Sequence, residues 1–349
     1  MIWLTWRQFR GSAAMMAALL VVLATTLALT GPGLASDYSA GIAACTQDNT
    51  CDRFYDRFLG GHDTSFMALT LVVLLLPALA GLFWGAPLIT RELEAGTHLM
   101  VWNQSITRGR WLAVKLGLMG LTAVAFAGLC GLMVTWWSDP LDKSAAEDLA
   151  LMAPLVFGAR GIAPMGYAAF AFVLGVTVGM LVRRTLPAMA LTLAVFAAIQ
   201  LAMPLLVRPH LMTPVTSTFE LSKMNLDGIG ISRDQGGHVE VRLNAAVPDH
   251  AGAWVLSSDL VDPSGRLIAG PEPGIGIVQV STTSGPCAPS SAGMGACPAE
   301  INRLGYRQKA TYQPLERFWP FQWIESGIYA LLTLGLTWLS FWWIRRRLS

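Results

Sequence analysis

Residues 85–115, GAPLITRELEAGTHLMVWNQSITRGRWLAVK, form a polar segment between two long apolar runs, and this arrangement decides the fold class. Residues 66–89 carry no charged side chain, and residues 116–137 carry none either. Each run is long enough to cross a hydrocarbon core about 30 Å thick, which takes roughly 20 apolar residues. The sequence therefore predicts two membrane-spanning helices joined by the polar segment.

The polar segment has the features of a short cytoplasmic loop that contains a helix. Short cytoplasmic loops are enriched in Lys and Arg, and the basic residues of this segment are Arg91, Arg108, Arg110 and Lys115. Apolar positions recur at helical spacing, and charged positions lie on the opposite face. The apolar set is Ile89, Leu93, Gly96 and Met100, and the charged set is Arg91, Glu92 and Glu94. This pattern predicts an amphipathic cytoplasmic helix at about residues 88–104 that lies along the membrane surface.

Two residues predict where the helices of this segment begin and end. Gly96 suits the left-handed conformation that closes a helix or forces a sharp bend. Thr107 suits the N-cap of the helix that enters the third span. The pattern alone is equally consistent with an ordinary loop packed on lipid headgroups and with a docking segment for a cytoplasmic partner.

The whole chain has the composition of a membrane protein. Of its 349 residues, 54% are hydrophobic and only 13% are charged, whereas about a quarter of the residues of a soluble domain are charged. We expect an all-α polytopic membrane protein with six transmembrane helices, at about residues 11–30, 65–89, 112–137, 162–182, 185–207 and 324–344. The first of these helices is expected to end at Gly31-Pro32-Gly33, and residues 34–64 are expected to form an external loop. A cleaved signal peptide is the alternative for residues 11–30, but this run is longer than the usual apolar region of a signal.

The distribution of basic residues predicts the orientation of the chain and its domain boundaries. Basic side chains cluster in residues 1–10, in the 85–115 segment, at 183–184 and at 345–347, all on one side of a six-span chain. Short loops rich in Lys and Arg stay in the cytoplasm, so we expect both termini there. The domains are then a cytoplasmic interfacial helix (1–10), the first five spans (11–207), an external domain (208–320), and the sixth span with a basic cytoplasmic tail (321–349).

Residues 208–320 predict a small β-rich external domain between the fifth and sixth spans. Polar and apolar residues alternate in HVEVRL (238–243), AWVLSSDLV (253–261), RLIAG (266–270) and GIVQVS (276–281). This alternation is typical of short strands. Asp262-Pro263-Ser264-Gly265 has the composition of a tight turn between two of them.

The cysteines predict two disulfides. Cys45 and Cys51 lie in one expected external loop and Cys287 and Cys297 in another, while Cys130 lies alone in an apolar run. Local pairs of this kind fit an oxidising exterior. A zinc site is the alternative, but no histidine lies at ligand spacing to either pair. We therefore expect two disulfides that cross-link these loops, Cys45–Cys51 and Cys287–Cys297, rather than a metal centre.

The chain lacks the sequence motifs of the common enzyme classes. It contains no G-x-x-x-x-G-K-[ST] phosphate loop, no H-E-x-x-H zinc motif and no G-x-S-x-G nucleophile elbow. Its formal net charge of +2 gives no indication of nucleic-acid binding. We expect a chain that is not an enzyme and binds no cofactor of its own.

A few side chains in the apolar runs are candidate functional residues. Glu325 lies at the outer mouth of the sixth span, where it is either hydrated at the interface or part of a gate. Gln200 in the fifth span either makes an interhelical hydrogen bond or contacts cargo in a central cavity. Phe196 and Met203 either pack in the bundle or line an adaptable apolar pocket.

The polar segment also resembles a known family. Its Glu92, Glu94, Gly96-Thr97, Thr107-Arg108 and Lys115 resemble the first cytoplasmic loop of type-2 ATP-binding-cassette (ABC) exporter permeases. In that family an E-x-E-x-G-T stretch is followed by Ser/Thr-Arg and then by a Lys that enters a span. The spacing here fits without a gap, although Gln104-Ser105 stand where the family often has Thr-Pro. The opening MIWLTWRQFR and the run YQPLERFWPFQWIE (312–325) resemble permeases of high-GC Gram-positive bacteria.

The resemblance implies a function and its partners. A cytoplasmic ATPase subunit, in two copies that carry the ATP and Mg, would receive a coupling segment made of Arg91, Glu92, Leu93, Glu94, Gly96, Thr97 and Arg108. Two permease chains would meet around a two-fold axis in the lipid of a bacterial plasma membrane. They would export an amphipathic small molecule such as a drug, an antibiotic or a lipid-like compound. The alternative is a membrane-anchored sensor whose external domain recognises a ligand, although the chain shows no cytoplasmic output domain.

Overall fold

The structure is a computed structural model that describes residues 2–48, 51–96, 107–144, 149–222, 224–232, 238–248, 250–268, 270, 272, 274–282, 285–288 and 296–346. Among these residues, six helices are long and apolar enough to cross a membrane. They are Ala13–Thr46, Arg57–Glu94, Arg108–Lys143, Ala163–Val182, Thr185–His210 and Leu315–Arg346. The prediction of six long apolar helices, with a small sheet region after the fifth, is therefore confirmed.

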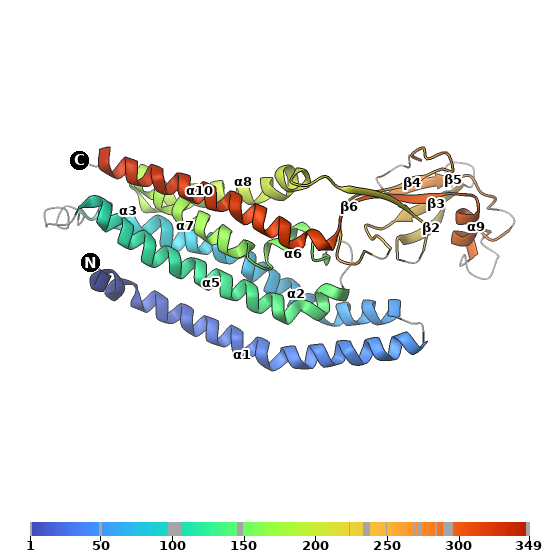
Figure 1. The fold of residues 1–349 in the computed structure, drawn as a ribbon, viewed down its shortest axis with the longest axis horizontal. Helices are drawn as coiled ribbons and strands as arrows, with labels where there is room; N and C mark the ends of the chain where they lie inside the picture. The colour runs from blue at the N-terminus through green and yellow to red at the C-terminus, as the bar shows by residue number, and fades with distance from the viewer. Residues whose placement is uncertain are drawn as a thin grey trace.

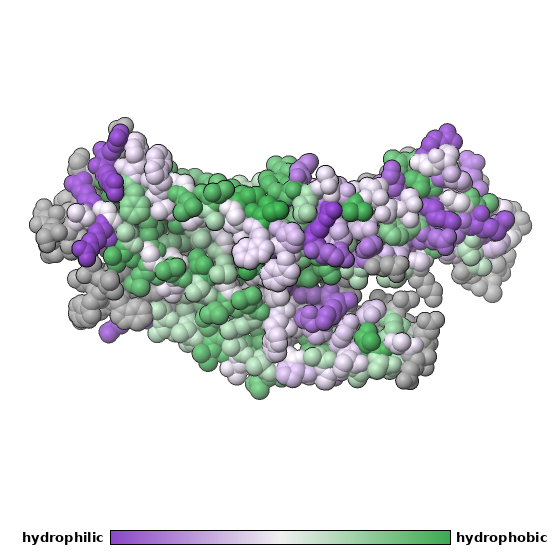
Figure 2. Space-filling model, in the orientation of Figure 1, coloured by the Kyte–Doolittle hydropathy of each residue, from purple (hydrophilic) through white to green (hydrophobic). Residues whose placement is uncertain are grey.

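The long helices form one bundle, with the sheet region beyond one end of it (Figure 1). The helical elements are α1 (Ile2–Asp48), α2 (Cys51–Ala80), the π-helical turn η1 (Gly81–Gly85), α3 (Ala86–Glu94), α5 (Arg108–Ser144), α6 (Pro154–Gly158), α7 (Ala163–Val182), α8 (Thr185–Ala202), the π-helical turn η3 (Met203–Val207), η4 (Arg208–His210), α9 (Cys297–Arg303), η6 (Leu315–Arg317) and α10 (Phe318–Arg346). Both ends of the chain lie at the opposite end of the bundle from the sheets, and we name the two ends the termini end and the sheet end. Apolar residues cover the middle of the bundle in Figure 2, and polar residues gather near the termini end and on the sheet region.

The first two long helices extend further than the sequence pattern predicts. Helix α1 does not end at Gly31-Pro32-Gly33 but continues to Asp48, and α2 begins at Cys51, so the expected loop at 34–64 is mostly helical. Gly31 serves packing rather than termination, because a Cβ there would lie 2.9 Å from the Trp136 ring of α5. A proline inside a long helix can be absorbed by a kink. The predicted Cys45–Cys51 disulfide is present and joins the two helices.

Helix α7 is the central helix of the bundle. Most of its side chains are buried, and it is apolar on every face, as expected for a helix enclosed by others. Its backbone makes a close crossing with η1: a Cβ at Gly175 would lie 2.3 Å from the Gly81 carbonyl oxygen, and a Cβ at Gly81 would lie 2.5 Å from the Ala171 carbonyl oxygen. Small residues at such crossings allow direct backbone contact. The second spanning helix is thereby fixed against α7 in mid-bundle.

The sheet region contains two three-stranded antiparallel sheets. One has the order β1 (Val215–Phe219), β6 (Arg307–Gln313), β4 (Trp254–Val261), and the other has the order β2 (Leu226–Ser232), β3 (His238–Leu243), β5 (Ile275–Val278). The strands predicted around β3, β4 and β5 are confirmed, whereas the described residues of 266–270 contribute only an isolated bridge at Leu267. Strands β1, β2 and β6 were not predicted. Because these strands are rich in Ser, Thr, Gln and Gly, the sequence pattern did not indicate them. Strand β6 even buries two polar residues, Gln308 and Gln313, on its core side.

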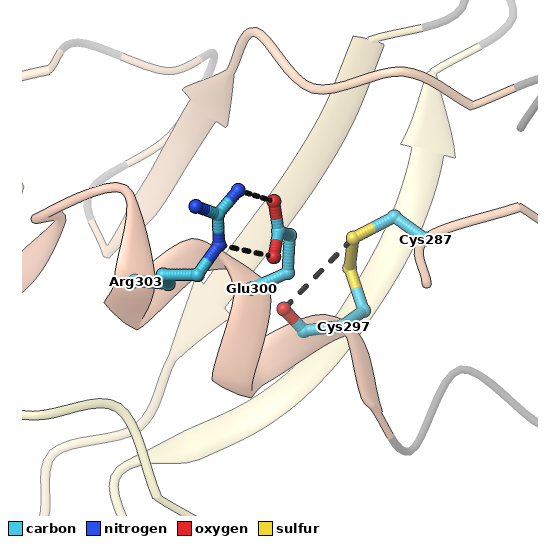
Figure 3. The surroundings of a disulfide bond; sticks show 4 residues. All are labelled: Cys287, Cys297, Glu300 and Arg303. Atoms are coloured by element: carbon cyan, nitrogen blue, oxygen red, sulfur yellow. Dashed lines mark hydrogen bonds and ion pairs between the residues drawn. A yellow bond between two sulfur atoms is a disulfide. The ribbon is translucent and has the colours of Figure 1, made fainter. Parts of the chain in front are cut away.

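Local bonds close the sheet region. The predicted Cys287–Cys297 disulfide is present at the start of α9, and Glu300 and Arg303 of that helix form an ion pair with nitrogen–oxygen distances of 2.8 and 2.6 Å (Figure 3). The predicted turn after β4 is also confirmed, since the Gly265 amide donates to the Asp262 carbonyl oxygen at 2.9 Å. The pKa of the Asp262 carboxyl is lowered, mainly by a hydrogen bond from the Ser264 hydroxyl and also by one from the Arg266 amide.

The close crossing of η1 and α7 generates a stability prediction. Gly175→Ala places a methyl group against the Gly81 carbonyl oxygen, and we expect it to lower the free energy of unfolding by about 1–3 kcal/mol, as over-packing does elsewhere. Gly117→Ala is the matched control, because no heavy atom lies within 4 Å of a Cβ at that helical position. Thermal unfolding of the detergent-solubilised protein measures the difference, and equal stability of the two variants would contradict the crossing.

Candidate functional site

The termini end of the bundle carries the predicted coupling residues. Residues 86–94 form α3, which follows η1 without a break and so continues the second spanning helix. The structure thus differs from the expected separate helix along the membrane surface, because Ala86, Ile89 and Thr90 are buried in the bundle and α3 packs on α7. Thr97 and the rest of the predicted coupling helix to residue 104 lie outside the described residues.

The two predicted helix boundaries are confirmed. Gly96 has a φ of 67° directly after the end of α3, and the Ala95 amide donates to the Arg91 carbonyl oxygen at 3.1 Å. Thr107 caps α5, since its hydroxyl oxygen accepts the Arg110 amide at 3.4 Å. The segment between α3 and α5 therefore starts and stops at the positions that local chemistry predicts.

Glu92 is turned toward the neighbouring helix α5. Its carboxylate forms an ion pair with the Lys115 ammonium group, and Lys115 keeps only 6% of its side-chain surface exposed. The Lys115 nitrogen also lies 4.6 Å from the centre of the Trp111 ring. Leu93, the next predicted residue, packs against the apolar cluster that holds Trp111 and Phe172.

Glu94 is turned toward α8. Its carboxylate accepts two hydrogen bonds from Thr185, the first residue of α8: one from the backbone amide at 2.8 Å and one from the hydroxyl at 2.7 Å. The Thr185 hydroxyl also lies 2.9 Å from that of Thr90 on α3. The amide groups of a first helical turn have no partner within their own helix, so a carboxylate from α3 completes the start of α8.

Basic residues surround this end of the bundle. Arg91 is exposed on α3, and Arg108 opens α5. A Cβ at Gly109 would lie 3.7 Å from a guanidinium nitrogen of Arg345, which places the start of α5 beside the end of α10. The turn between α7 and α8 adds Arg183, in the left-handed conformation with φ 60°, and Arg184. A surface of this charge suits an anionic or mixed-charge partner.

A second site lies toward the sheet end, where Glu325 is paired with Arg208. Its two carboxylate oxygens accept hydrogen bonds from the Arg208 guanidinium at 2.8 and 3.0 Å, and one of them also accepts the Tyr167 hydroxyl. Glu325 is fully buried and Arg208 is 2% exposed, so the expected interfacial hydration of Glu325 is wrong. The Arg208 guanidinium also lies 4.2 Å from the centre of the Phe157 ring.

An apolar cleft of about 370 Å³ opens beside this ion pair. Its lining residues come from α2, α6, α7, α8 and α10, with η3 and η4, and are Leu74, Leu75, Ala78, Pro154, Leu155, Gly158, Tyr167, Leu193, Phe196, Ala197, Gln200, Leu201, Pro204, Arg208 and Glu325. The structure thus brings together three residues singled out from sequence: Phe196, Gln200 and Glu325. Met203 packs instead in the bundle core. The expected interhelical hydrogen bond of Gln200 is present, donated by the Tyr329 hydroxyl.

Sequence reasoning missed the partners of these charges. Arg208 and Tyr167 lie far from Glu325 along the chain, and no local pattern links them. A second buried pair was also missed: Arg160 donates to Asp142 at 3.3 Å and to the Thr70 hydroxyl at 3.3 Å. One indication of these pairs was present in the sequence: isolated charged residues lie beside apolar runs. A charged side chain buried there without a counter-charge would cost free energy, so a partner was to be expected. Over the described ranges, no group of three or more metal-ligating side chains comes together.

Comparison with known proteins gives one family match. Residues 17–208, more than half of the chain, match the family described as ABC-2 membrane transporter related. No curated protein and no solved structure matches the chain. The matched region runs from α1 through α8 to the start of η4. It includes α3, the segment after it and the start of α5, and it stops where the sheet region begins.

The buried ion pair generates a prediction. Glu325→Ala leaves Arg208 buried without its counter-charge, and we expect a loss of about 3–5 kcal/mol in the free energy of unfolding. The double variant Arg208→Met/Glu325→Met removes both charges and should recover most of this loss. Thermal unfolding followed by tryptophan fluorescence measures both, and a Glu325→Ala variant as stable as the parent would contradict the pairing.

Proposed function

Because the chain belongs to the ABC-2 membrane transporter related family, we propose that it is the membrane-spanning permease subunit of an ABC exporter. Members of this family are membrane components of transporters, and their energy comes from an ABC ATPase subunit. The observation that carries the proposal is the family match over α1 to α8, which includes the segment from α3 to α5. The six long apolar helices support a multi-pass membrane protein.

The orientation we infer places the termini end in the cytoplasm of a bacterial cell. Basic residues of α3, of the start of α5, of the α7–α8 turn and of the end of α10 gather at this end, and basic short loops favour the cytoplasmic side. The disulfides support the same orientation. One joins the end of α1 to the start of α2 and the other lies at the start of α9, and these helix ends lie toward the sheet end (Figure 1); disulfides persist outside the reducing cytoplasm.

The ATPase subunit docks at the termini end in this proposal. The segment between Gly96 and Thr107 follows the exposed Arg91 in the chain, and the described residues that flank it are the helix end at Gly96 and the N-cap at Thr107. Two ATPase copies and a second permease chain complete a two-fold assembly, in which ATP binding on the partner alternates the access of the pathway. The ATP and Mg belong to the partner.

The cleft beside Arg208 and Glu325 supports an amphipathic small molecule as cargo. Its walls are mostly apolar, and Leu75 and Leu201 among its lining residues are 57% and 65% exposed on the outer surface of the bundle. Gln200, Tyr167 and the ion pair place polar groups at its inner side. A molecule with an apolar body and a hydrogen-bonding end fits both parts, as ligand pockets commonly combine apolar walls with a few polar groups.

The partner subunit is tested by purification. The tagged chain is isolated in mild detergent from membranes of the cell that makes it, and we expect an ABC ATPase to co-purify with Mg-dependent, vanadate-sensitive ATP hydrolysis. Arg91→Glu reverses the exposed charge on α3 and should reduce the bound ATPase without lowering the thermal stability of the permease. Cargo movement by liposomes that contain this chain alone would contradict the proposal.

The cargo site is tested by filling the cleft. Ala197→Trp places an indole in the cleft, and we expect it to abolish export of an amphipathic dye while the ATPase stays bound. Ala194→Trp is the matched control, since Ala194 is exposed on the same helix but does not line the cleft. Efflux from cells that carry each variant is measured. Equal efflux by the two variants would place the cargo elsewhere.

A further inference from the structure

We propose that Glu92 and Glu94 are positioning residues that link the predicted coupling segment (residues 91–108) to α5 and α8, rather than residues on which the partner docks. This inference rests on the proposed function and assigns a role to two of its coupling residues. The motif resemblance places both glutamates at the partner surface. Their side chains are instead turned toward neighbouring helices of the same chain.

The spacing of the two glutamates explains why they reach different helices. Successive residues of an α-helix are rotated by about 100° around the helix axis. Two residues that are two positions apart, as Glu92 and Glu94 are, therefore differ by about 200° and lie on nearly opposite faces of the helix. On α3 one of these faces meets α5 and the other meets α8. The single residue between the two glutamates, Leu93, packs in the apolar cluster between the helices. An E-x-E spacing therefore lets one short helix hold two neighbours.

The Glu92 link is an ion pair of low exposure. Lys115 and Glu92 keep 6% and 21% of their side-chain surfaces exposed. The ammonium group lies between the carboxylate and the Trp111 ring, 4.6 Å from the ring centre. Removal of Glu92 leaves a positive charge in a largely dehydrated place, so α3 and α5 are held at a defined separation by the need to pair it.

The Glu94 link completes the first turn of another helix. Its carboxylate accepts both the amide and the hydroxyl of Thr185, and negative charge is favourable at the start of a helix. Thr90, one turn earlier on α3, makes a second contact with the Thr185 hydroxyl at 2.9 Å. Helix α3 thus contacts the first residue of α8 through two of its own side chains, directly after the turn at Arg183.

The consequence is a mechanical path from the partner to the cleft. A displacement of the end of α3 moves the start of α8 through Thr185, and α8 carries Phe196 and Gln200 in the cleft wall. Helix α7 stays fixed by its buried position. Coupling between distant sites requires such a contiguous chain of packed groups and hydrogen bonds. The two glutamates therefore transmit movement, and partner binding falls to other residues of the segment.

The test separates partner binding from cleft movement. Spin labels at Leu155→Cys and Leu193→Cys, on two walls of the cleft, report its width by pulsed electron paramagnetic resonance in the permease–ATPase complex. ATP with vanadate should shift the distance distribution of the parent. In Glu94→Ala we expect the shifted population to fall by about fivefold or more, while the amount of bound ATPase is unchanged.

Further variants keep the test independent of folding defects in α3. Thr185→Val removes the hydroxyl from the other side of the link and should reduce the shift as Glu94→Ala does, whereas Thr185→Ser should retain it. Glu92→Lys should also lose the shift, and the exchanged pair Glu92→Lys/Lys115→Glu should restore it. Glu300→Gln, which removes an exposed ion pair of the sheet region, is the control that leaves the shift intact.

The outcomes distinguish this inference from the proposed function. Loss of the bound ATPase in Glu94→Ala, with a parent-like shift in Thr185→Val, would overturn the positioning role and make Glu94 a docking residue. A parent chain that binds no ATPase would overturn the proposed function and the inference with it. A parent that binds and shifts, with Glu94→Ala and Thr185→Val that bind but do not shift, is the result expected.

Discussion

Buried charges must be paired, and this constraint organises the helical bundle. Three ion pairs of low exposure join different segments of the bundle: Lys115 with Glu92, Arg160 with Asp142, and Arg208 with Glu325. Because each pair is largely shielded from water, a rearrangement of the helices that separated its two charges would leave them buried without a counter-charge, at a large cost in free energy. The pairs therefore fix which helices are neighbours at both ends of the bundle, while apolar contact fills the middle.

Between these ends the fold depends on one close helix crossing. The glycines of η1 and α7 allow the two backbones to touch, and α7 is buried on all sides. A bundle held in this way has a fixed centre and a more exposed periphery of α1, α8 and α10. Movement imposed at the termini end is then expected in the peripheral helices. This arrangement supports the proposal of a permease driven by a separate ATPase.

Local chemistry made much of the fold predictable from sequence. Gly96, Thr107 and both cysteine pairs were assigned correctly because a cap or a short-range disulfide depends on neighbouring residues. Gly31-Pro32-Gly33 was misleading because its glycine packs against Trp136, a contact that no local pattern shows. The partner of Glu325 is 117 residues away, so its burial could not be predicted. Likewise, the sequence identified Phe196 and Gln200 but could not show that they share a cleft with Arg208.

The central claim is that α3 and the segment after it lie in the cytoplasm, where a partner works the permease. The most direct measurement is the reaction of Arg91→Cys with a membrane-impermeant maleimide in intact cells and in inside-out vesicles. In the described structure the native cysteines are in disulfides or buried, so labelling reports position 91. The account predicts labelling of the vesicles alone, reduced when the ATPase is bound. Labelling of intact cells would contradict it.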